Sequence, residues 1–194
     1  MSQWEAIVMG CSAGGLKALK VVLSGLRPKR PVPVLVVCHT ASDDLGGLST
    51  LLGNVSHWPV REARERERPE AGVVQLAPSG YHLLVERDKH LALSIDKRVS
   101  FARPSIDVLF NSVASAYGAA VIGVVMTGAN HDGADGLKAI RQGGGIGVVQ
   151  DPKSAEVPIM PLAAIAQAGA DHILGLDEIG ALLTRMIDMR PVVQ

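Results

Sequence analysis

The sequence is poor in the residues that mark several classes of protein. Phe, Trp and Tyr together make up 3% of its 194 residues, and there are only two cysteines. Two cysteines are too few for a disulfide framework or a cysteine-rich metal site. Lysine and arginine together number 19, as do aspartate and glutamate, so no excess of positive charge favours nucleic acid. We therefore expect no nucleic-acid partner and no bound metal.

Long apolar runs are also missing. No apolar stretch approaches the roughly 18 residues that a membrane-spanning helix requires. Trp4 and Glu5 interrupt the start of the chain, where a secretory signal would be uniformly apolar. Internal repeats and low-complexity segments are absent as well. We expect residues 1–194 to form a single domain without membrane insertion, located in the cytoplasm.

What the chain has in abundance is small and aliphatic side chains. Apolar residues make up 47% of the sequence, and it contains 21 glycines. Because aromatics are so few, the core must be built from Val, Leu, Ile and Ala. That mixture is typical of a buried parallel sheet alternating with helices. The predicted fold class is α/β: a doubly wound, mostly parallel sheet with helices on both faces and a small antiparallel β insertion.

The spacing of apolar and turn residues predicts the elements along the chain. The main strands are expected at 4–10, 31–38, 119–126, 145–149 and 171–174. Helices are expected at 16–26, 45–52, 106–117, 134–142, within 154–168, and at 177–189. Short strands at 73–76, 81–86 and 91–95 are expected to form the antiparallel insertion. The charge-alternating segment 61–70 is predicted to be a solvated edge strand or loop rather than a binding patch.

The most informative motif follows the first expected strand. Ser12 lies between Gly10 and Gly14, and an amphipathic helix begins directly afterwards. A strand, a sharp turn and a helix form the setting in which a serine hydroxyl is exposed as a nucleophile. The helix also directs free backbone N–H groups towards that position, which suits a developing oxyanion. Taken alone, a glycine-rich turn of this kind is more often a phosphate cradle or a plain tight turn than a nucleophile elbow.

Reactive side chains also follow two other expected strands. His39 ends the second strand, and Asp132 lies in the glycine-rich loop after the strand that ends at Met126. In an open parallel sheet, sites form at the carboxyl ends of strands. We therefore expect Ser12, His39 and Asp132 to converge as nucleophile, base and orienting acid. Taken singly, His39 could be a structural histidine and Asp132 an N-cap of the next helix.

Other candidate residues are weaker. Cys38 precedes His39, but adjacent strand residues point to opposite faces, so we expect Cys38 in the core. Cys11 is likewise expected to be a small buried residue. His131 is an alternative base, although a loop neighbour of Asp132 would rarely be oriented correctly. The remaining histidines, at positions 57, 82, 90 and 172, show no metal-ligand spacing.

Several segments together resemble a known family, the catalytic domain of chemotaxis protein-glutamate methylesterases of the CheB type. The segments that carry the resemblance are Gly10–Gly15, His39, Leu76–His82, Arg103–Phe110, Gly123–Ala134, Gln150–Pro152 and Met160–Pro161. The resemblance implies a doubly wound parallel sheet and a Ser12, His39, Asp132 triad. It implies hydrolysis of glutamyl methyl esters, with release of methanol, and deamidation of glutamines. The implied partner is a methyl-accepting chemoreceptor or a similar helical signalling protein.

The chain departs from the family pattern near the nucleophile. Ala13 stands where the family usually has Thr, and Cys38 where it usually has Gln. Ala129 and Asn130 replace the usual Met and Gly of the loop before Asp132. The resemblance places an oxyanion-hole N–H at the Met position, and Ala129 can still supply it. The family usually carries an N-terminal receiver domain, which this sequence does not contain. The sequence is then either a domain excised from a longer protein or a stand-alone form regulated in another way, for example by a separate regulatory protein.

Two alternatives to an active hydrolase remain. The loop substitutions motivate a catalytically weak interaction domain of a chemotaxis-like pathway. A nucleotide-binding module built on Gly10–Gly15 ranks last, because a dinucleotide fingerprint and a P-loop lysine are both missing. No organic cofactor is expected. With few aromatics to build a deep pocket, we expect a shallow cleft edged by the loops Thr40–Gly47 and Ala129–Asp132. Such a cleft suits one side chain presented on a protein helix.

Overall fold

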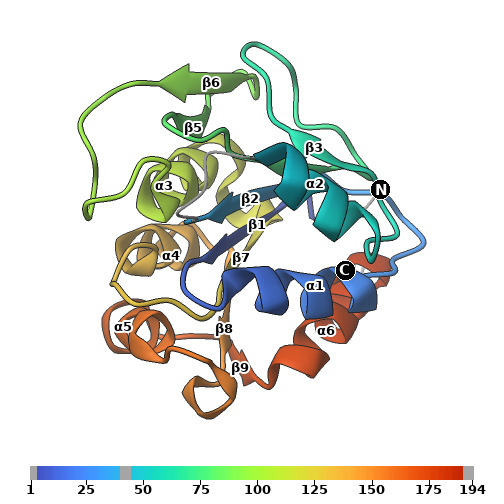
Figure 1. Cartoon of the computed structure of the whole chain (residues 1–194), viewed down its shortest axis with the longest axis vertical. Helices are drawn as coiled ribbons and strands as arrows, with labels where there is room; N and C mark the ends of the chain where they lie inside the picture. Colours follow the sequence, from blue (N-terminus) through green and yellow to red (C-terminus); the bar gives the residue numbers. More distant parts are fainter. Residues whose placement is uncertain (1–3, 40–44, 190–194) are drawn as a thin grey trace.

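The computed structural model describes residues 4–39 and 45–189 of the chain. In these residues a parallel sheet forms the centre of the molecule (Figure 1). Its strands are β1 (Ala6–Cys11), β2 (Val34–Cys38), β3 (Val60–Glu62), β4 (Val74–Leu76), β7 (Val121–Val125), β8 (Ile146–Gln150) and β9 (His172–Leu174). They lie in the order β3-β4-β2-β1-β7-β8-β9, and every neighbouring pair is parallel.

Helices cover both faces of this sheet (Figure 1). One face packs against α1 (Gly15–Gly25), α2 (Leu45–Gly53) and α6 (Leu176–Asp188). The other packs against α3 (Ile106–Tyr117), α4 (Ala134–Gln142) and α5 (Ile159–Ala168). Two short 3₁₀ turns, η1 (Gly118–Ala120) and η2 (Pro152–Ser154), complete the helical segments. This arrangement confirms the predicted α/β fold with a doubly wound sheet.

The core is aliphatic, as the composition requires. All six residues of β1 are buried, because the strand has neighbours on both edges and helices on both faces. Leu19 and Leu23 of α1 pack into one core cluster with Leu183 of α6. Phe110 of α3 is the one aromatic side chain among the fully buried residues of the opposite cluster. Burial on both sides fixes the end of β1, where the site begins.

The antiparallel insertion is smaller than the sequence suggested. It consists of β5 (His82–Val85) and β6 (Leu91–Ser94), which pair with each other and pack near α3. The prediction that residues 73–76 belong to it was wrong, since β4 pairs in parallel with β2 and β3 in the main sheet. A short apolar run suits either position, so its pairing partner depends on tertiary structure.

The charged segment 61–70 lies where it was predicted. Its first residues belong to the edge strand β3, and the rest is loop. Arg61 forms ion pairs with Glu67 and Glu70, at 2.7 and 3.0 Å. Pairing within the segment gives its alternating charges a local structural role.

The strand order places three carboxyl ends side by side. From β1 the chain moves to β2 on one side of the sheet, and it later returns to β7 on the other side of β1. Loops that leave adjacent strands in opposite directions open a crevice between them. Ser12, His39 and the loop 126–133 follow these three strands and therefore lie at the crevice.

Most predicted helices match the observed ones. The helices expected at 106–117 and 134–142 have those bounds, and the last begins at Leu176 rather than Asp177. Most of the loop Thr40–Gly47, which was expected to edge the cleft, lies outside the described residues. None of the helices formed by residues 4–39 and 45–189 combines the length and the apolar character needed to cross a membrane.

Candidate active site

Ser12 occupies a sharp turn between β1 and α1. Its backbone N–H donates to the carbonyl of Thr127 at 2.9 Å, and its own carbonyl accepts from Gly15 at 2.7 Å. Gly14 is the N-cap of α1 and has a φ of +77°, a backbone conformation that residues with a Cβ rarely adopt. These bonds hold the half-buried Ser12 at the N-terminus of α1, in the strand–turn–helix setting predicted for it.

The loop after β7 supports this turn from the other side. The Thr127 hydroxyl donates to the carbonyl of Ala13 at 2.8 Å and accepts from the backbone N–H of Val157 at 2.9 Å. A Cβ added to Gly128 would lie 3.0 Å from the Ser12 Cβ, closer than nearly all real contacts of that kind. Glycine at position 128 therefore allows the loop to lie this close to Ser12.

His39 contacts Asp132 at the end of β2. The ring nitrogen Nε2 lies 3.0 Å from Oδ2 of Asp132. The N–H direction of Nε2 does not point at that oxygen, so the contact is a short electrostatic one rather than an in-line hydrogen bond. Since Nε2 faces the acid, Nδ1 is the ring nitrogen left for another partner. The side chain of His39 is 13% exposed and that of Asp132 is fully buried.

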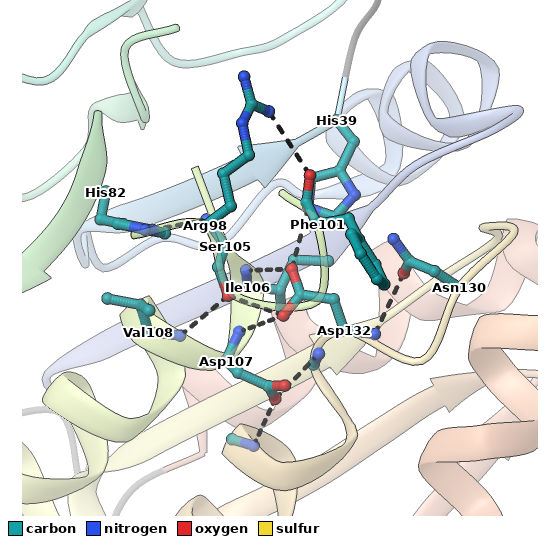
Figure 2. Close-up of polar contacts among 12 residues, drawn as sticks. His39, His82, Arg98, Phe101, Ser105, Ile106, Asp107, Val108, Asn130 and Asp132 are labelled. Carbon is teal, nitrogen blue, oxygen red and sulfur yellow. Dashed lines mark hydrogen bonds and ion pairs between the residues drawn. The ribbon is translucent and has the colours of Figure 1, made fainter. Parts of the chain in front are cut away.

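Three hydrogen-bond donors and the His39 ring surround the Asp132 carboxylate (Figure 2). Oδ2 accepts the backbone N–H of Ile106 at 2.7 Å as well as the His39 contact. Oδ1 accepts the hydroxyl of Ser105 at 2.8 Å and the backbone N–H of Asp107 at 3.0 Å. Asp132 therefore caps the N-terminus of α3, where the helix dipole favours a negative charge. Its position is fixed by α3 rather than by its own loop.

These contacts determine the charge of Asp132. Burial would raise the pKa of its carboxyl group, but the contact with His39 and the N–H groups of Asp107 and Ile106 outweigh burial. The pKa of Asp132 therefore lies below its ordinary value. An ionised carboxylate beside Nε2 stabilises a positive charge on the His39 ring, which is what an orienting acid must do.

Asp107 caps the N-terminus of α4, as Asp132 caps that of α3. One of its carboxylate oxygens accepts the N–H groups of Gly133 and Gly136, at 2.9 and 2.7 Å, at the start of α4. Burial raises the pKa of Asp107 to about 6; the N–H of Gly136 opposes this shift, and the negative charge of Asp132 adds to it. The two buried carboxyl groups thus have pKa values shifted in opposite directions.

A buried histidine supports the start of α3. His82 accepts the N–H of Ser105 at Nδ1, at 3.1 Å, and its Nε2 lies 3.0 Å from the carbonyl of Lys97. His82, Ser105 and Asp107 all fall in segments that carry the family resemblance, yet sequence reasoning gave them no role in the site. The bonds that join them to one another, to Asp132 and to the start of α4 reach across 23 to 29 positions, so periodicity and local spacing do not show them.

Ser12 and His39 line the same surface cavity. Asn130 borders it on the side of α4, and the loop Ser100–Pro104 borders it on the side of α3. Ser12 and His39 also line an adjoining cavity along α1, which extends to Lys20. Within the described residues no hydrogen bond joins the Ser12 hydroxyl to the His39 ring. Ser12 and His39 thus face the same cavity, whereas Asp132 lies behind His39.

Two exposed backbone N–H groups flank Ser12. Ala13 follows Ser12 at the start of the turn, and Ala129 follows Gly128 in the opposing loop. In the part of the chain that the structure describes, neither backbone N–H donates a hydrogen bond. Both are available to an oxygen that develops negative charge beside Ser12.

The structure also corrects the weaker expectations. Cys38 packs against the core but is half-buried and lines both cavities, because β2 ends at Cys38 and strand alternation does not extend to His39. Cys11 is fully buried, as predicted. His131 is exposed and lines neither cavity. The N-cap of α4 is Gly133, whereas Asp132 caps α3. Among residues 4–39 and 45–189, no cluster of three or more His, Cys, Asp or Glu side chains could hold a metal ion.

Comparison with known proteins places the chain in a family. The family model for CheB methylesterase matches residues 7–183. A provisionally named protein-glutamate methylesterase/protein-glutamine glutaminase of Leptospira interrogans is 44% identical over 183 residues, which are 94% of this chain and 95% of that protein. Protein-glutamate methylesterase/protein-glutamine glutaminase 2 of Anaeromyxobacter dehalogenans is 40% identical over 182 residues, and the match spans 53% of its length.

The fold agrees with these sequence matches. The catalytic domain of the CheB methylesterase from Thermotoga maritima superimposes with a TM-score of 0.90 and is 27% identical in sequence. The match covers 95% of this chain and 99% of that one. The family model, the relatives and the fold agree, and they show that the chain belongs to the CheB methylesterase family.

Proposed function

We propose that this protein is a serine hydrolase that removes methyl esters from glutamyl side chains of a methyl-accepting chemoreceptor, and that it also deamidates glutamines there. The observation that carries the proposal is the shared cavity of Ser12 and His39, with the buried carboxylate of Asp132 behind the histidine. The names of the relatives, which describe methylesterases and glutaminases acting on protein side chains, support the same reaction.

The proposed reaction begins with a proton transfer. Nδ1 of His39 takes the proton of the Ser12 hydroxyl as Oγ attacks the ester carbonyl. Asp132 stabilises the resulting imidazolium, because its carboxylate is held ionised against Nε2. The backbone N–H groups of Ala13 and Ala129 bind the oxyanion of the tetrahedral intermediate.

The second half of the reaction releases the products. His39 returns its proton to the leaving oxygen, and methanol departs from the acyl-enzyme on Ser12. Water, deprotonated by His39, then attacks the acyl group. The bond to Ser12 Oγ breaks, His39 returns the proton to Oγ, and the glutamic acid side chain is released and ionises. With a glutamine side chain the leaving group is ammonia, and the remaining steps are the same.

The surroundings of the cavity favour a side chain on a large partner. The loop on the α3 side presents Phe101, which is 92% exposed, beside Arg98, whose guanidinium donates to the Phe101 carbonyl (Figure 2). An exposed aromatic group next to a basic side chain gives a partner protein contacts at the rim of the cavity, away from Ser12. Contacts remote from the reacting bond can supply the binding energy that positions a short side chain at Ser12.

This geometry fits a hydrolase better than the two alternatives. Capping of α3 accounts for the buried carboxylate of Asp132 in an interaction domain, but not for its contact with a histidine that shares a cavity with Ser12. A nucleotide site at the start of α1 would occupy the same turn, but the turn lacks a P-loop lysine and a dinucleotide fingerprint. We also propose a location in the cytoplasm, where the methylated segments of a chemoreceptor substrate would have to lie to reach this site.

The test measures methanol released from a methyl-esterified chemoreceptor fragment and from a small methyl ester. We expect higher catalytic efficiency on the fragment, and loss of nearly all turnover in Ser12→Ala without loss of the folded state, since the turn contributes little packing. Equal efficiency on both substrates would favour a general esterase. Unchanged turnover in Ser12→Ala would exclude the mechanism.

A further inference from the structure

Two cysteines that the proposed reaction does not use lie directly beside it. Cys11 is the last residue of β1 and precedes Ser12, and Cys38 is the last residue of β2 and precedes His39. The two are direct partners in the parallel pairing of β1 with β2. The backbone N–H of His39 donates to the carbonyl of Cys11 at 2.9 Å, which fixes the two strand ends together.

The two sulfur atoms lie on the same side of the sheet, beneath the start of α1. A Cβ added to Gly15 would lie 2.6 Å from the Cys11 Sγ and 3.2 Å from the Cys38 Sγ. The thiols are hydrogen-bonded to each other. Neighbouring parallel strands are about 4.8 Å apart, which falls within the Cα separation that disulfides span. The pair can therefore form a disulfide with only a small movement of the strand ends.

The two thiols differ in access and in acidity. Cys11 is fully buried, whereas Cys38 is half-buried and lines both cavities beside Ser12. The hydrogen bond from the Cys11 thiol lowers the pKa of Cys38, and the same bond together with burial raises the pKa of Cys11. A solvent-accessible cysteine with a buried thiol beside it is the arrangement of a reactive and a resolving cysteine.

We propose that Cys38 is a peroxide-reactive thiol that forms a reversible disulfide with Cys11, and that this disulfide suppresses hydrolysis at Ser12. The Cys38 thiolate attacks one oxygen of hydrogen peroxide, the O–O bond breaks, and a sulfenic acid and hydroxide result. The Cys11 sulfur then attacks the Cys38 sulfur, the S–O bond breaks, and the Cys11 proton leaves with that oxygen as water. In total, two thiols and one peroxide give one disulfide and two waters.

The disulfide affects the site through the backbone. Closing an S–S bond of about 2.05 Å moves the two sulfur atoms, and the strand ends that carry them shift at the residues before Ser12 and His39. A displacement of about 1 Å between reacting groups can cost roughly 10²-fold in rate. Disulfides under strain are more easily reduced, which suits a reversible modification. If the cysteines only filled space in the core, peroxide would leave both as thiols.

The first experiment counts thiols in the folded protein before and after hydrogen peroxide. Because the chain contains only two cysteines, the count is unambiguous. After denaturation, the reduced protein should take up two N-ethylmaleimide groups and the peroxide-treated protein none. Dithiothreitol should restore both, and a non-reducing gel should show a monomer. Two reactive thiols after peroxide, or a disulfide between chains, would overturn the proposal.

Two variants identify the order of the steps. In Cys11→Ala, peroxide should leave a sulfenic acid on Cys38 that dimedone captures, because the resolving thiol is gone. In Cys38→Ala, the buried Cys11 should stay open to alkylation after denaturation. If Cys11 in that variant were oxidised as fast as in the wild type, Cys38 would not be the reactive thiol.

The second experiment measures the effect on the site, and this half of the proposal rests on the proposed function. A fluorophosphonate should label Ser12 at least about tenfold more slowly in the oxidised protein, and dithiothreitol should restore the rate. Cys38→Ala should label at one rate before and after peroxide. Equal labelling of oxidised and reduced wild type would overturn the control of hydrolysis. If the fluorophosphonate did not label Ser12 even in the reduced protein, the proposed function would be wrong. The thiol count would still show whether the disulfide forms.

Discussion

Asp107 and Asp132 each cap the helix that belongs to the other. Asp132 precedes α4 yet accepts the first N–H groups of α3, from Ile106 and Asp107. Asp107 lies in the first turn of α3 yet accepts the N–H groups of Gly133 and Gly136 at the start of α4. This exchange joins two helix ends around the carboxylate that faces His39. The position of that carboxylate is therefore tied to the stability of the fold.

The first prediction concerns Asp132→Asn. Each oxygen of Asp132 accepts two contacts, so an amide group must face donors whichever way it is turned. We expect turnover to fall by about 10²–10⁴ through loss of the orienting charge. We also expect the free energy of unfolding to fall by about 1–3 kcal/mol, because buried donors lose their partner. Kinetics and urea denaturation measure the two effects.

His39→Gln is the matched control for that variant. His39 contacts Asp132 but caps no helix, so its replacement should reduce turnover at least as much with little change in unfolding free energy. Equal destabilisation by both variants would show that the bonds of Asp132 to α3 contribute little. Activity retained in Asp132→Asn would remove Asp132 from the mechanism.

The second prediction is a pH dependence of stability set by Asp107. Its pKa is raised from 3.8 to about 6, so between these values the folded state binds more protons than the unfolded state. The stabilising contribution of this group is therefore complete below pH 3.8 and is lost as the pH rises through 6. At about 1.4 kcal/mol for each pKa unit, the loss is about 3 kcal/mol.

Asp107→Asn isolates this contribution. The Asn oxygen can accept from Gly133 and Gly136, which both donate to a single oxygen of Asp107. Urea denaturation across pH 4–7 should show the variant gaining stability relative to the wild type by up to about 3 kcal/mol as the pH rises. A difference that stays constant over this range would contradict the raised pKa.

The third prediction concerns the close approach of Gly128 to Ser12. The Cβ of Gly128→Ala would lie 2.5 Å from the Met160 Cε and 3.0 Å from the Ser12 Cβ. The flexible end of Met160 can move away from the new Cβ. The Cβ of Ser12 belongs to a turn held by backbone hydrogen bonds, so the remaining contact should displace the loop and Ser12. We expect turnover to fall by about 10-fold to 10²-fold while the protein remains folded. Gly53→Ala, in α2 with open space around it, is the control and should keep wild-type turnover.

The fourth prediction concerns metals. The proposed reaction uses only Ser12, His39, Asp132 and backbone N–H groups, so dialysis against a chelator should leave the rate of ester hydrolysis unchanged. Loss of activity on dialysis, restored by one particular divalent metal, would contradict a purely serine-type mechanism.

The sequence predicts those features that depend on local pattern. The helix Ala134–Gln142 was predicted with its observed bounds, because an amphipathic pattern follows a glycine-rich loop. The nucleophile turn at Ser12 was likewise visible in the change from strand to helix pattern. The parallel pairing of residues 74–76 could not be predicted in this way, because an apolar run of that length fits an antiparallel hairpin as well as a parallel sheet.

The parts of the site that the sequence does not reveal are long-range. Asp132 caps a helix that begins 26 positions earlier, and no local rule connects the two. The access of Cys38 to the cavities depends on where β2 ends, since strand alternation stops applying at His39. Both features follow from how the strand ends and helix starts meet in space, which a single sequence does not specify.

The most direct test of the account is covalent labelling by a fluorophosphonate, with the modified residue located by peptide mapping. If Ser12 is a nucleophile activated by His39, the reduced protein should carry one adduct per chain on Ser12. The adduct should be absent from Ser12→Ala and should form much more slowly in His39→Gln. Labelling that persists in Ser12→Ala, or an absence of labelling in the folded wild type, would contradict the account.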